Sequence, residues 1–208
     1  MSDVAGFLLR LALIGPPVLI AIIVHEIAHG WVANRLGDDT AARAGRLTLN
    51  PLPHIDPIGS VVLPLLLTWS GSPYIFGWAK PVPVNFSRLR HPQRDMAIVA
   101  LAGPGSNLVQ ALAWAALHAL GAAAGWEIVG LVAAVGVTVN IVLAVFNLLP
   151  ILPLDGGRVL VGLLPREPAL ALARLEPYGM LIVMALLFTG VLSQVVGPLT
   201  RSLLRVLL

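Results

Sequence analysis

Long apolar runs dominate the chain, and four of them are long enough to cross a membrane. They cover roughly 10–33, 96–120, 127–149 and 178–199. A bilayer core of about 30 Å needs about 20 apolar residues in a helix. The pattern therefore predicts an all-α membrane protein with about four transmembrane helices, organised as a single integral-membrane domain over 1–208.

A fifth apolar run, 58–69, is too short to cross the membrane comfortably. Its twelve residues include Pro64, and a helix of that length reaches only about 18 Å. We therefore expect a re-entrant or β-like segment at roughly 47–90, which dips into the membrane and returns. Irregular backbone at membrane depth is tolerated only where it is buried in protein or lines a wet cavity, so this segment implies a cavity.

The composition agrees with a membrane protein. Of 208 residues, 58% are hydrophobic and 11% are charged, whereas a soluble domain carries about 25% charged residues. There are no cysteines, which excludes disulfides, thiolate metal ligands and cysteine catalysis. Gly190 and the Gly197–Pro198 pair are places where the last helix could bend.

The basic residues are topology signals, and we expect no nucleic-acid partner. If the segment 58–69 returns to the side it came from, ten of the thirteen basic residues lie on one side, leaving Arg10, Arg201 and Arg205 on the other. If it crosses, the split is eight to five. Cytoplasmic loops carry the excess of Lys and Arg, so the re-entrant arrangement is favoured. It places the long loops in the cytoplasm.

The sequence HEIAH places His25, Glu26 and His29 inside the first apolar run. Histidines four residues apart share one face of a helix and can bind one metal ion, while Glu26 lies about 100° round the helix, where a general base belongs. The alternative is a chance match or a buried polar network. Because a charged residue near the bilayer centre costs about 2.5–3.5 kcal/mol on insertion scales, three ionisable groups here favour a functional site.

A catalytic zinc usually takes three protein ligands and keeps one position open. The candidates for the third ligand are Asp155, Glu127, His118, His54 and Asp56. Asp155 is favoured because it follows the helix at 127–149, and the topology puts it on the same side as His29. Gly156 and Gly157 after it permit a sharp turn of the backbone. His54 could act as a gate or an occasional ligand, or it could fix a turn.

Three motifs together, HEIAH, AGPGSN (102–107) and FNLLPILPLDGG (146–157), resemble the site-2 protease family of intramembrane zinc metalloproteases. The similarity extends over about 20–180 and is to small prokaryotic members without a PDZ or nucleotide-sensing domain. It implies one Zn²⁺ ion bound by His25, His29 and Asp155, with Glu26 as the base. It also implies that Asn147 helps to hold the substrate or the oxyanion.

The same resemblance implies an endopeptidase that cuts within or near a transmembrane segment of a membrane-protein substrate. The enzyme would be a multi-pass protein of a prokaryotic cell membrane, surrounded by the lipid bilayer, with its active site toward the cytoplasm.

Two asparagines and one proline-rich segment are further candidates. Asn140 lies seven residues before Asn147, so it could line the cavity or hydrogen-bond a neighbouring helix. For Asn107 a helix contact is favoured over a chemical role. In GWAKPVPVN, Pro81 and Pro83 fall at alternate positions of a possible edge strand, and the other edge could pair with an unwound substrate.

Three other functions are compatible with part of this pattern. A membrane metal-binding or transport protein could use His25, His29 and Asp155 as a relay, but transporters usually distribute polar residues over several helices across the membrane, and Glu26 would then have no role. A catalytically silent scaffold of the same fold would not need the complete set of ligands and base. Another HExxH protease class would need a glutamate as third ligand, and no suitably placed one exists.

Overall fold

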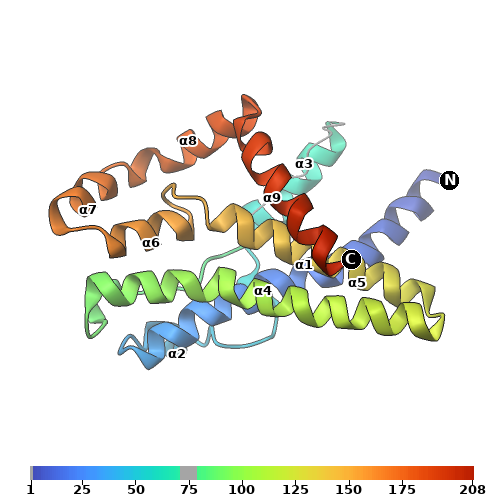
Figure 1. Cartoon of the computed structure of the whole chain (residues 1–208), viewed down its shortest axis with the longest axis horizontal. Helices are drawn as coiled ribbons and strands as arrows, with labels where there is room; N and C mark the ends of the chain where they lie inside the picture. Colours follow the sequence, from blue (N-terminus) through green and yellow to red (C-terminus); the bar gives the residue numbers. More distant parts are fainter. Residues whose placement is uncertain (1, 71–78) are drawn as a thin grey trace.

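The computed structural model describes residues 2–70 and 79–208, and all regular elements in these ranges are helical (Figure 1). The α-helices are α1 (Ser2–Arg35), α2 (Thr40–Arg43), α3 (Leu63–Trp69), α4 (Pro92–Ala124), α5 (Glu127–Asn147), α6 (Asp155–Leu163), α7 (Arg166–Ala173), α8 (Glu176–Phe188) and α9 (Val191–Leu207). Shorter turns are η1 (Leu52–His54), η2 (Pro57–Val62) and η3 (Phe86–Arg88).

Three helices are long and apolar enough to cross a membrane. They are the part of α1 from Leu11 to Arg35, α4 and α5. The pair α7 and α8, bent by 65° at a short break, would make a fourth span if it crosses as one unit. The prediction of an all-α protein with about four membrane helices is therefore confirmed.

The helix α4 is the centre of the bundle. It packs against α1, α5 and α6, and Figure 1 shows it running the length of the molecule beside them. It ends at Gly125, whose φ of 70° is left-handed, a backbone conformation that glycine adopts without steric cost. α5 then returns antiparallel to α4, so α1, α4 and α5 form one packed unit that carries the motifs found in the sequence.

The helix predicted over 178–199 is not continuous, which corrects the sequence-based boundaries. Gly190 has a φ of 75° and separates α8 from α9, because a left-handed residue ends an α-helix. α9 then packs along α5, so that Arg201 lines the same groove as Val142 and Phe146 of α5. The count of basic residues on each side predicts that Arg201 lies beyond the outer end of the last span. In the structure Arg201 instead lies beside α5.

The segment at 47–90 contains short helical turns in its described part, and no strand. Residues 79–85 have no regular secondary structure, and 71–78 lie outside the described residues. Pro81 and Pro83 have no N–H to donate, and the N–H groups of Val82 and Asn85 donate to carboxylates of the first helix and the loop after it. These residues therefore pair with side chains instead of forming a sheet ladder.

Candidate metal centre

The two histidines of α1 present the same nitrogen to a common point. The Nδ1 of His25 lies 2.6 Å from the side-chain oxygen of Asn107, and the Nδ1 of His29 lies 2.7 Å from the carbonyl oxygen of Val99. Both oxygens are acceptors, so each Nδ1 carries the proton and donates it. Each Nε2 therefore keeps its lone pair, and the two Nε2 atoms are 3.0 Å apart.

Asp155, the first residue of α6, brings a carboxylate to the same point. Its Oδ2 lies 3.2 Å from Nε2 of His25 and 3.4 Å from Nε2 of His29. Gly156 and Gly157 make this placement possible, because a Cβ on Gly156 would lie 2.2 Å from the carbonyl oxygen of Leu148. Neither glycine has a positive φ, so the DGG sequence is required for close packing of the backbone and not for a left-handed turn.

The three converging atoms suit a zinc ion. In a tetrahedral site with bonds of about 2.0–2.1 Å, ligand atoms are about 3.3–3.4 Å apart, close to the separations here. No hydrogen bond reaches Oδ2 of Asp155 although this atom is buried. Two lone pairs and a carboxylate oxygen repel one another at such distances unless a positive charge lies among them. Among the described residues, His25, His29 and Asp155 are the group of potential metal ligands that the structure brings together.

The AGPGSN motif of α4 supports both histidines. A Cβ on Gly103 would lie 2.3 Å from Nε2 of His29 and 2.6 Å from Cε1 of His25, so only glycine leaves room for the rings. Asn107, one turn later on the same face, accepts the hydrogen bond from His25. The helix contact expected for Asn107 is confirmed, but its hydrogen bond to His25 and the role of Gly103 were not predicted. The available signal was the spacing of four residues between this glycine and this asparagine in a predicted membrane helix.

Asn107 is itself fixed by a buried network. Its Nδ2 donates to the side-chain oxygen of Asn140 at 2.8 Å and to the carbonyl oxygen of Ala21 at 3.3 Å. Asn140 donates in turn to the carbonyl oxygen of Gly136 at 2.9 Å. Both asparagines have an exposed fraction of 0%. Of the two roles considered for Asn140, the structure therefore favours the contact between helices, because its side chain cannot reach a substrate.

Glu26 lies beside the proline-rich segment. Its Oε2 accepts a hydrogen bond of 2.7 Å from the backbone N–H of Val82. Lys80, two residues earlier, is held by its N–H, which donates to the carbonyl oxygen of His54, and by its own oxygen, which accepts from Arg46. The segment is thus fastened across α1 at the position of the candidate base.

Asp38 fastens the other end of this segment. It is fully buried, and its carboxylate accepts hydrogen bonds from the N–H and hydroxyl of Thr40 and, at 2.6 Å, from the N–H of Asn85. Burial works to raise the pKa of Asp38, but these hydrogen bonds and the charge of Arg88 outweigh it and lower the pKa below the ordinary 3.8. The carboxylate is therefore ionised at neutral pH.

The other candidates for the third ligand are engaged elsewhere. His54 is buried, with its Nε2 3.0 Å from the carbonyl oxygen of Thr48, a contact that fixes the loop. Asp56 accepts hydrogen bonds from the first N–H groups of η2. His118 bonds the carbonyl oxygen of Gly130, and Glu127 lies in the first turn of α5, the end opposite to Asp155.

Asn147 is the last residue of α5 and is partly buried. Its Nδ2 donates to the carbonyl oxygen of Leu143 at 3.0 Å. It makes no hydrogen bond to the three candidate metal ligands among the residues described.

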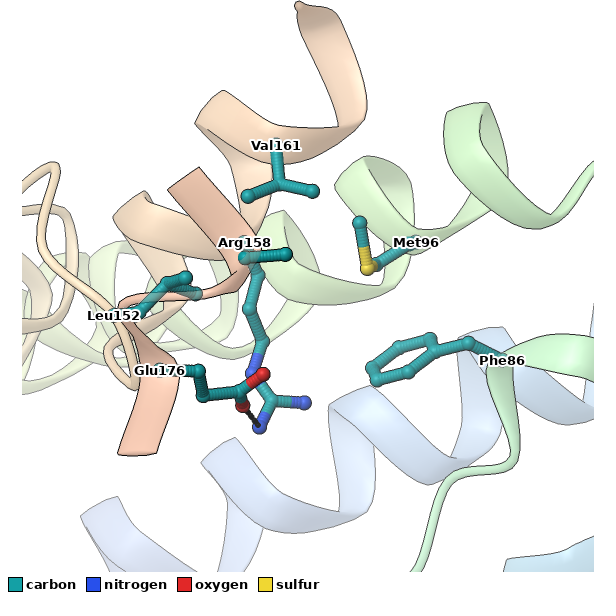
Figure 2. A pocket seen from close by; sticks show the side chains of 7 residues that line it. Phe86, Met96, Leu152, Arg158, Val161 and Glu176 are labelled. Atoms are coloured by element: carbon teal, nitrogen blue, oxygen red, sulfur yellow. Dashed lines mark hydrogen bonds and ion pairs between the residues drawn. The ribbon is translucent and has the colours of Figure 1, made fainter. Parts of the chain in front are cut away.

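Arg158 connects α6 to two other parts of the molecule. Its guanidinium lies 3.1 Å from a carboxylate oxygen of Glu176, at the start of α8, and 5.3 Å from the ring centre of Phe86. Figure 2 shows it between these two side chains, at the wall of a cavity of about 90 Å³ that Met96 and Leu152 also line. The short helix that begins with Asp155 is thereby tied to the segment after the proline-rich stretch and to α8.

The fold and the site together define a class: a bundle of membrane helices that encloses two histidines and an aspartate at metal-binding distances. Residues 116–190 match the model of "Peptidase family M50". The chain is 36% identical to "Putative zinc metalloprotease YwhC" of Bacillus subtilis over 192 residues, which cover 89% of this chain and 84% of that protein.

Two mycobacterial proteins, each named "Putative zinc metalloprotease Rip2", are also similar. The protein from Mycolicibacterium smegmatis is 34% identical over 85% of this chain and 66% of its own length. The protein from Mycobacterium tuberculosis H37Rv is 31% identical over 84% and 66% respectively. No solved structure matches the chain. The chain belongs to peptidase family M50, the site-2 protease family of zinc metalloproteases, and the resemblance inferred from its motifs is confirmed.

Proposed function

We propose that this protein is an intramembrane zinc-dependent endopeptidase that hydrolyses a peptide bond within or near a transmembrane segment of a membrane-protein substrate. The observation that carries the proposal is the convergence of Nε2 of His25, Nε2 of His29 and Oδ2 of Asp155 within a bundle of candidate membrane spans. Three protein ligands leave one position open, which is the arrangement of a catalytic zinc site.

In this proposal His25, His29 and Asp155 hold one Zn²⁺ ion. When bound, zinc polarises the scissile carbonyl group and lowers the pKa of water to about 7. The hydrogen bonds to Asn107 and Val99 fix the tautomer and the orientation of the two imidazoles, which is the usual role of the partners of ligating histidines.

Glu26 acts as the general base in this mechanism. Its carboxylate takes a proton from the attacking water and delivers it to the leaving amine. The N–H of Val82 binds Oε2 and so restricts the rotation of the side chain, leaving the other oxygen to receive the proton.

Asn147 donates a hydrogen bond to the developing oxyanion. One hydrogen of its amide is used on the carbonyl oxygen of Leu143, and the second remains for the substrate. Removing one donor of this kind typically costs about 2.7–4 kcal/mol of transition-state stabilisation.

The substrate must become extended before attack, because a peptide bond inside a helix is shielded and already hydrogen-bonded. The segment from Lys80 to Asn85 is the surface on which an unwound substrate can pair by strand addition. The N–H of Val82 is used by Glu26, whereas the N–H of Val84 bonds no residue that the structure describes. The pairing therefore depends on Val84 and on backbone carbonyl groups.

The position of the site supports access from the cytoplasm. His29 lies six residues before the end of α1 at Arg35, a depth of about 9 Å. Asp155 follows the end of α5 on the same side, and most basic residues belong to the loops of this side. In a bacterial cell membrane this side faces the cytoplasm under the positive-inside rule.

The decisive experiment compares the wild type with Glu26→Gln and Asp155→Ala, using purified protein and a single-pass membrane substrate. We expect Glu26→Gln to keep its zinc and lose cleavage, and Asp155→Ala to lose both, with zinc measured by mass spectrometry. Glu127→Gln is the matched control, because Glu127 is exposed at the opposite end of α5, and it should behave as the wild type. Equal cleavage by wild type and Glu26→Gln would instead favour metal transport or a silent scaffold.

A further inference from the structure

A cavity of about 90 Å³ lies between η3, α4, α6 and the start of α8 (Figure 2). Most of its walls are apolar, and they include Phe86 of η3, Met96 of α4, Leu152 of the loop before α6, and Val161 of α6. We propose that this cavity is a specificity subsite, which accepts an aliphatic side chain of about the size of leucine from the substrate. The inference rests on the proposed function, because it names the substrate residue that such a peptidase would select.

The walls of the cavity follow directly from the residues of the metal centre. Leu152 lies three residues before Asp155, and Arg158, another wall residue, lies three residues after it. On α4, Met96 lies three residues before Val99, whose carbonyl oxygen holds one of the two histidines. Three residues of a helix cover about 4.5 Å along its axis. The cavity therefore begins about one helical turn away from the candidate metal ligands.

The cavity also lies where the segment proposed to pair with the substrate ends. This segment runs from Lys80 to Asn85 and is bound to Glu26 through the N–H of Val82. The next residue, Phe86, is a wall of the cavity. An extended substrate advances about 3.3 Å per residue, so the residue that reaches the cavity lies about two to four positions from the scissile bond. It lies on the side of that bond that is nearer to α6.

The volume of the cavity limits the side chain that it can hold. An apolar cavity of about 150 Å³ binds benzene, and this cavity has about three fifths of that volume. It therefore has room for about four carbon atoms, the number in the side chain of leucine. The indole ring of tryptophan is larger than benzene and does not fit.

The charged groups at the cavity pair with each other, so they select an uncharged side chain. A guanidinium nitrogen of Arg158 lies 3.1 Å from a carboxylate oxygen of Glu176, and no other described residue that lines the cavity is charged. These two side chains are 31% and 46% exposed, whereas Leu152 is 5% exposed. The ion pair thus lies at the mouth and apolar groups lie deeper. A charged substrate side chain would leave water there without gaining a free partner.

The test uses the purified full-length protein and a series of single-pass membrane substrates. Mass spectrometry first locates the cut, and each of the four substrate residues on the α6 side of it is then replaced in turn by alanine, leucine, tryptophan and aspartate. We expect one position at which leucine gives a kcat/KM about 10- to 100-fold higher than the other three residues, because an apolar pocket discriminates by about this factor.

Substitutions in the cavity should shift this preference in opposite directions. Val161→Phe fills the cavity, so it should lower kcat/KM for the leucine substrate about tenfold or more and leave the alanine substrate within about twofold. Met96→Ala enlarges the cavity and should raise kcat/KM for the tryptophan substrate. Leu163→Phe is the matched control, because Leu163 lies two residues later in α6, is 74% exposed and does not line the cavity. If Val161→Phe does not fold, Ala173→Leu fills the same cavity from α7.

The outcomes separate the subsite from the proposed function. Equal kcat/KM for all substrates at every position would mean that the cavity is a packing void, and it would overturn the inference while the peptidase activity stands. The inference also fails if Val161→Phe lowers kcat/KM for the leucine and alanine substrates equally, or if Leu163→Phe shifts the preference as much as Val161→Phe does. If no substrate is cleaved, or if Glu26→Gln cleaves as the wild type does, the proposed function fails and the subsite fails with it.

Discussion

At the scale of single residues, the candidate metal centre requires glycine at position 103, where there is no room for a side chain. Gly103 stands where a methyl group would overlap the rings of both histidines. Close packing of this kind cannot relax by rotation of a side chain, because the histidines are themselves held by hydrogen bonds to Asn107 and Val99.

We therefore expect Gly103→Ala to lose most of its bound metal. Gly105, two residues later in α4, has no atom within 4 Å of an added Cβ, so Gly105→Ala should keep its metal and gain up to about 1 kcal/mol of stability from better helix propensity. Metal content by mass spectrometry and thermal unfolding check both variants. Equal metal content in the two would show that the space at Gly103 is not needed.

Asn107 and Asn147 should affect different properties. Asn107→Ala removes the acceptor for the N–H of His25, and loss of such a partner typically lowers metal affinity about 10–100-fold. Asn147→Ala removes a residue whose side chain hydrogen-bonds the carbonyl oxygen of Leu143 in its own helix and none of the three candidate ligands, so metal affinity should not change while cleavage falls. Competition with a zinc chelator and a cleavage assay separate the two effects. A similar loss of metal affinity in both variants would contradict these assignments.

The sequence predicted the residues of the metal group because their spacing carries the information. Two histidines four residues apart must share a helix face, and Asp155 follows a helix that ends on the same side. The role of Asn107 could not be predicted in this way. It depends on which side chain of α4 meets His25 across the helix interface, and that is set by the rotation of α4 about its axis, which a single sequence does not specify.

At the scale of elements, the segment from Lys80 to Asn85 matters most for the proposed chemistry. The groups that hold it come from distant parts of the chain: Glu26, Arg46, the carbonyl oxygen of His54, and Asp38. Its position beside the candidate base is thus determined by four separate contacts and not by a sheet.

Proline at two positions tests this segment. Val82→Pro removes the N–H that binds Glu26, and Val84→Pro removes an N–H that bonds no described residue. We expect both variants to keep their zinc and lose cleavage, the first because Glu26 is no longer held and the second because the substrate can no longer pair. Cleavage assays with zinc analysis measure this. Unchanged cleavage in Val84→Pro would rule out strand pairing and leave only the contact with Glu26.

The long helices were predictable at this scale, and the break between α8 and α9 was predictable only as a place where bending could occur. Glycine occurs within many membrane helices without ending them. α8 ends at Phe188, and Gly190, with its left-handed φ, leads into α9, which packs along α5. A packing contact of that range is not visible in local sequence. The helical character of residues 57–69 could not be predicted for a different reason: a short apolar run alone does not distinguish a strand from a helix.

At the scale of the whole molecule, Asp38 links stability to pH. Because the pKa of Asp38 is lower in the folded protein than the ordinary 3.8, its ionised form stabilises the fold. This contribution is complete above the pKa of the unfolded chain and is lost as the pH falls through the folded pKa.

Asp38→Asn should therefore lower stability at pH 7 by about 1.5–3 kcal/mol, the value of hydrogen bonds to a charged group. The difference from the wild type should narrow as the pH falls below about 4. Thermal unfolding in detergent between pH 7 and pH 3 measures it. A difference that stays constant over this range would show that the charge of Asp38 does not contribute.

The helix α6 is nine residues long, and it carries Asp155 at its first position and Arg158 one turn later. The two side chains therefore move as one rigid body, with the candidate zinc ligand at one end and the contact to Glu176 of α8 at the other. If α8 moves and this ion pair is kept, α6 moves with it, and the position of Asp155 relative to His25 and His29 changes. In the proposed reaction, a movement of α8 that admits a substrate would therefore have to break the ion pair between Arg158 and Glu176, or it would shift Asp155 relative to His25 and His29.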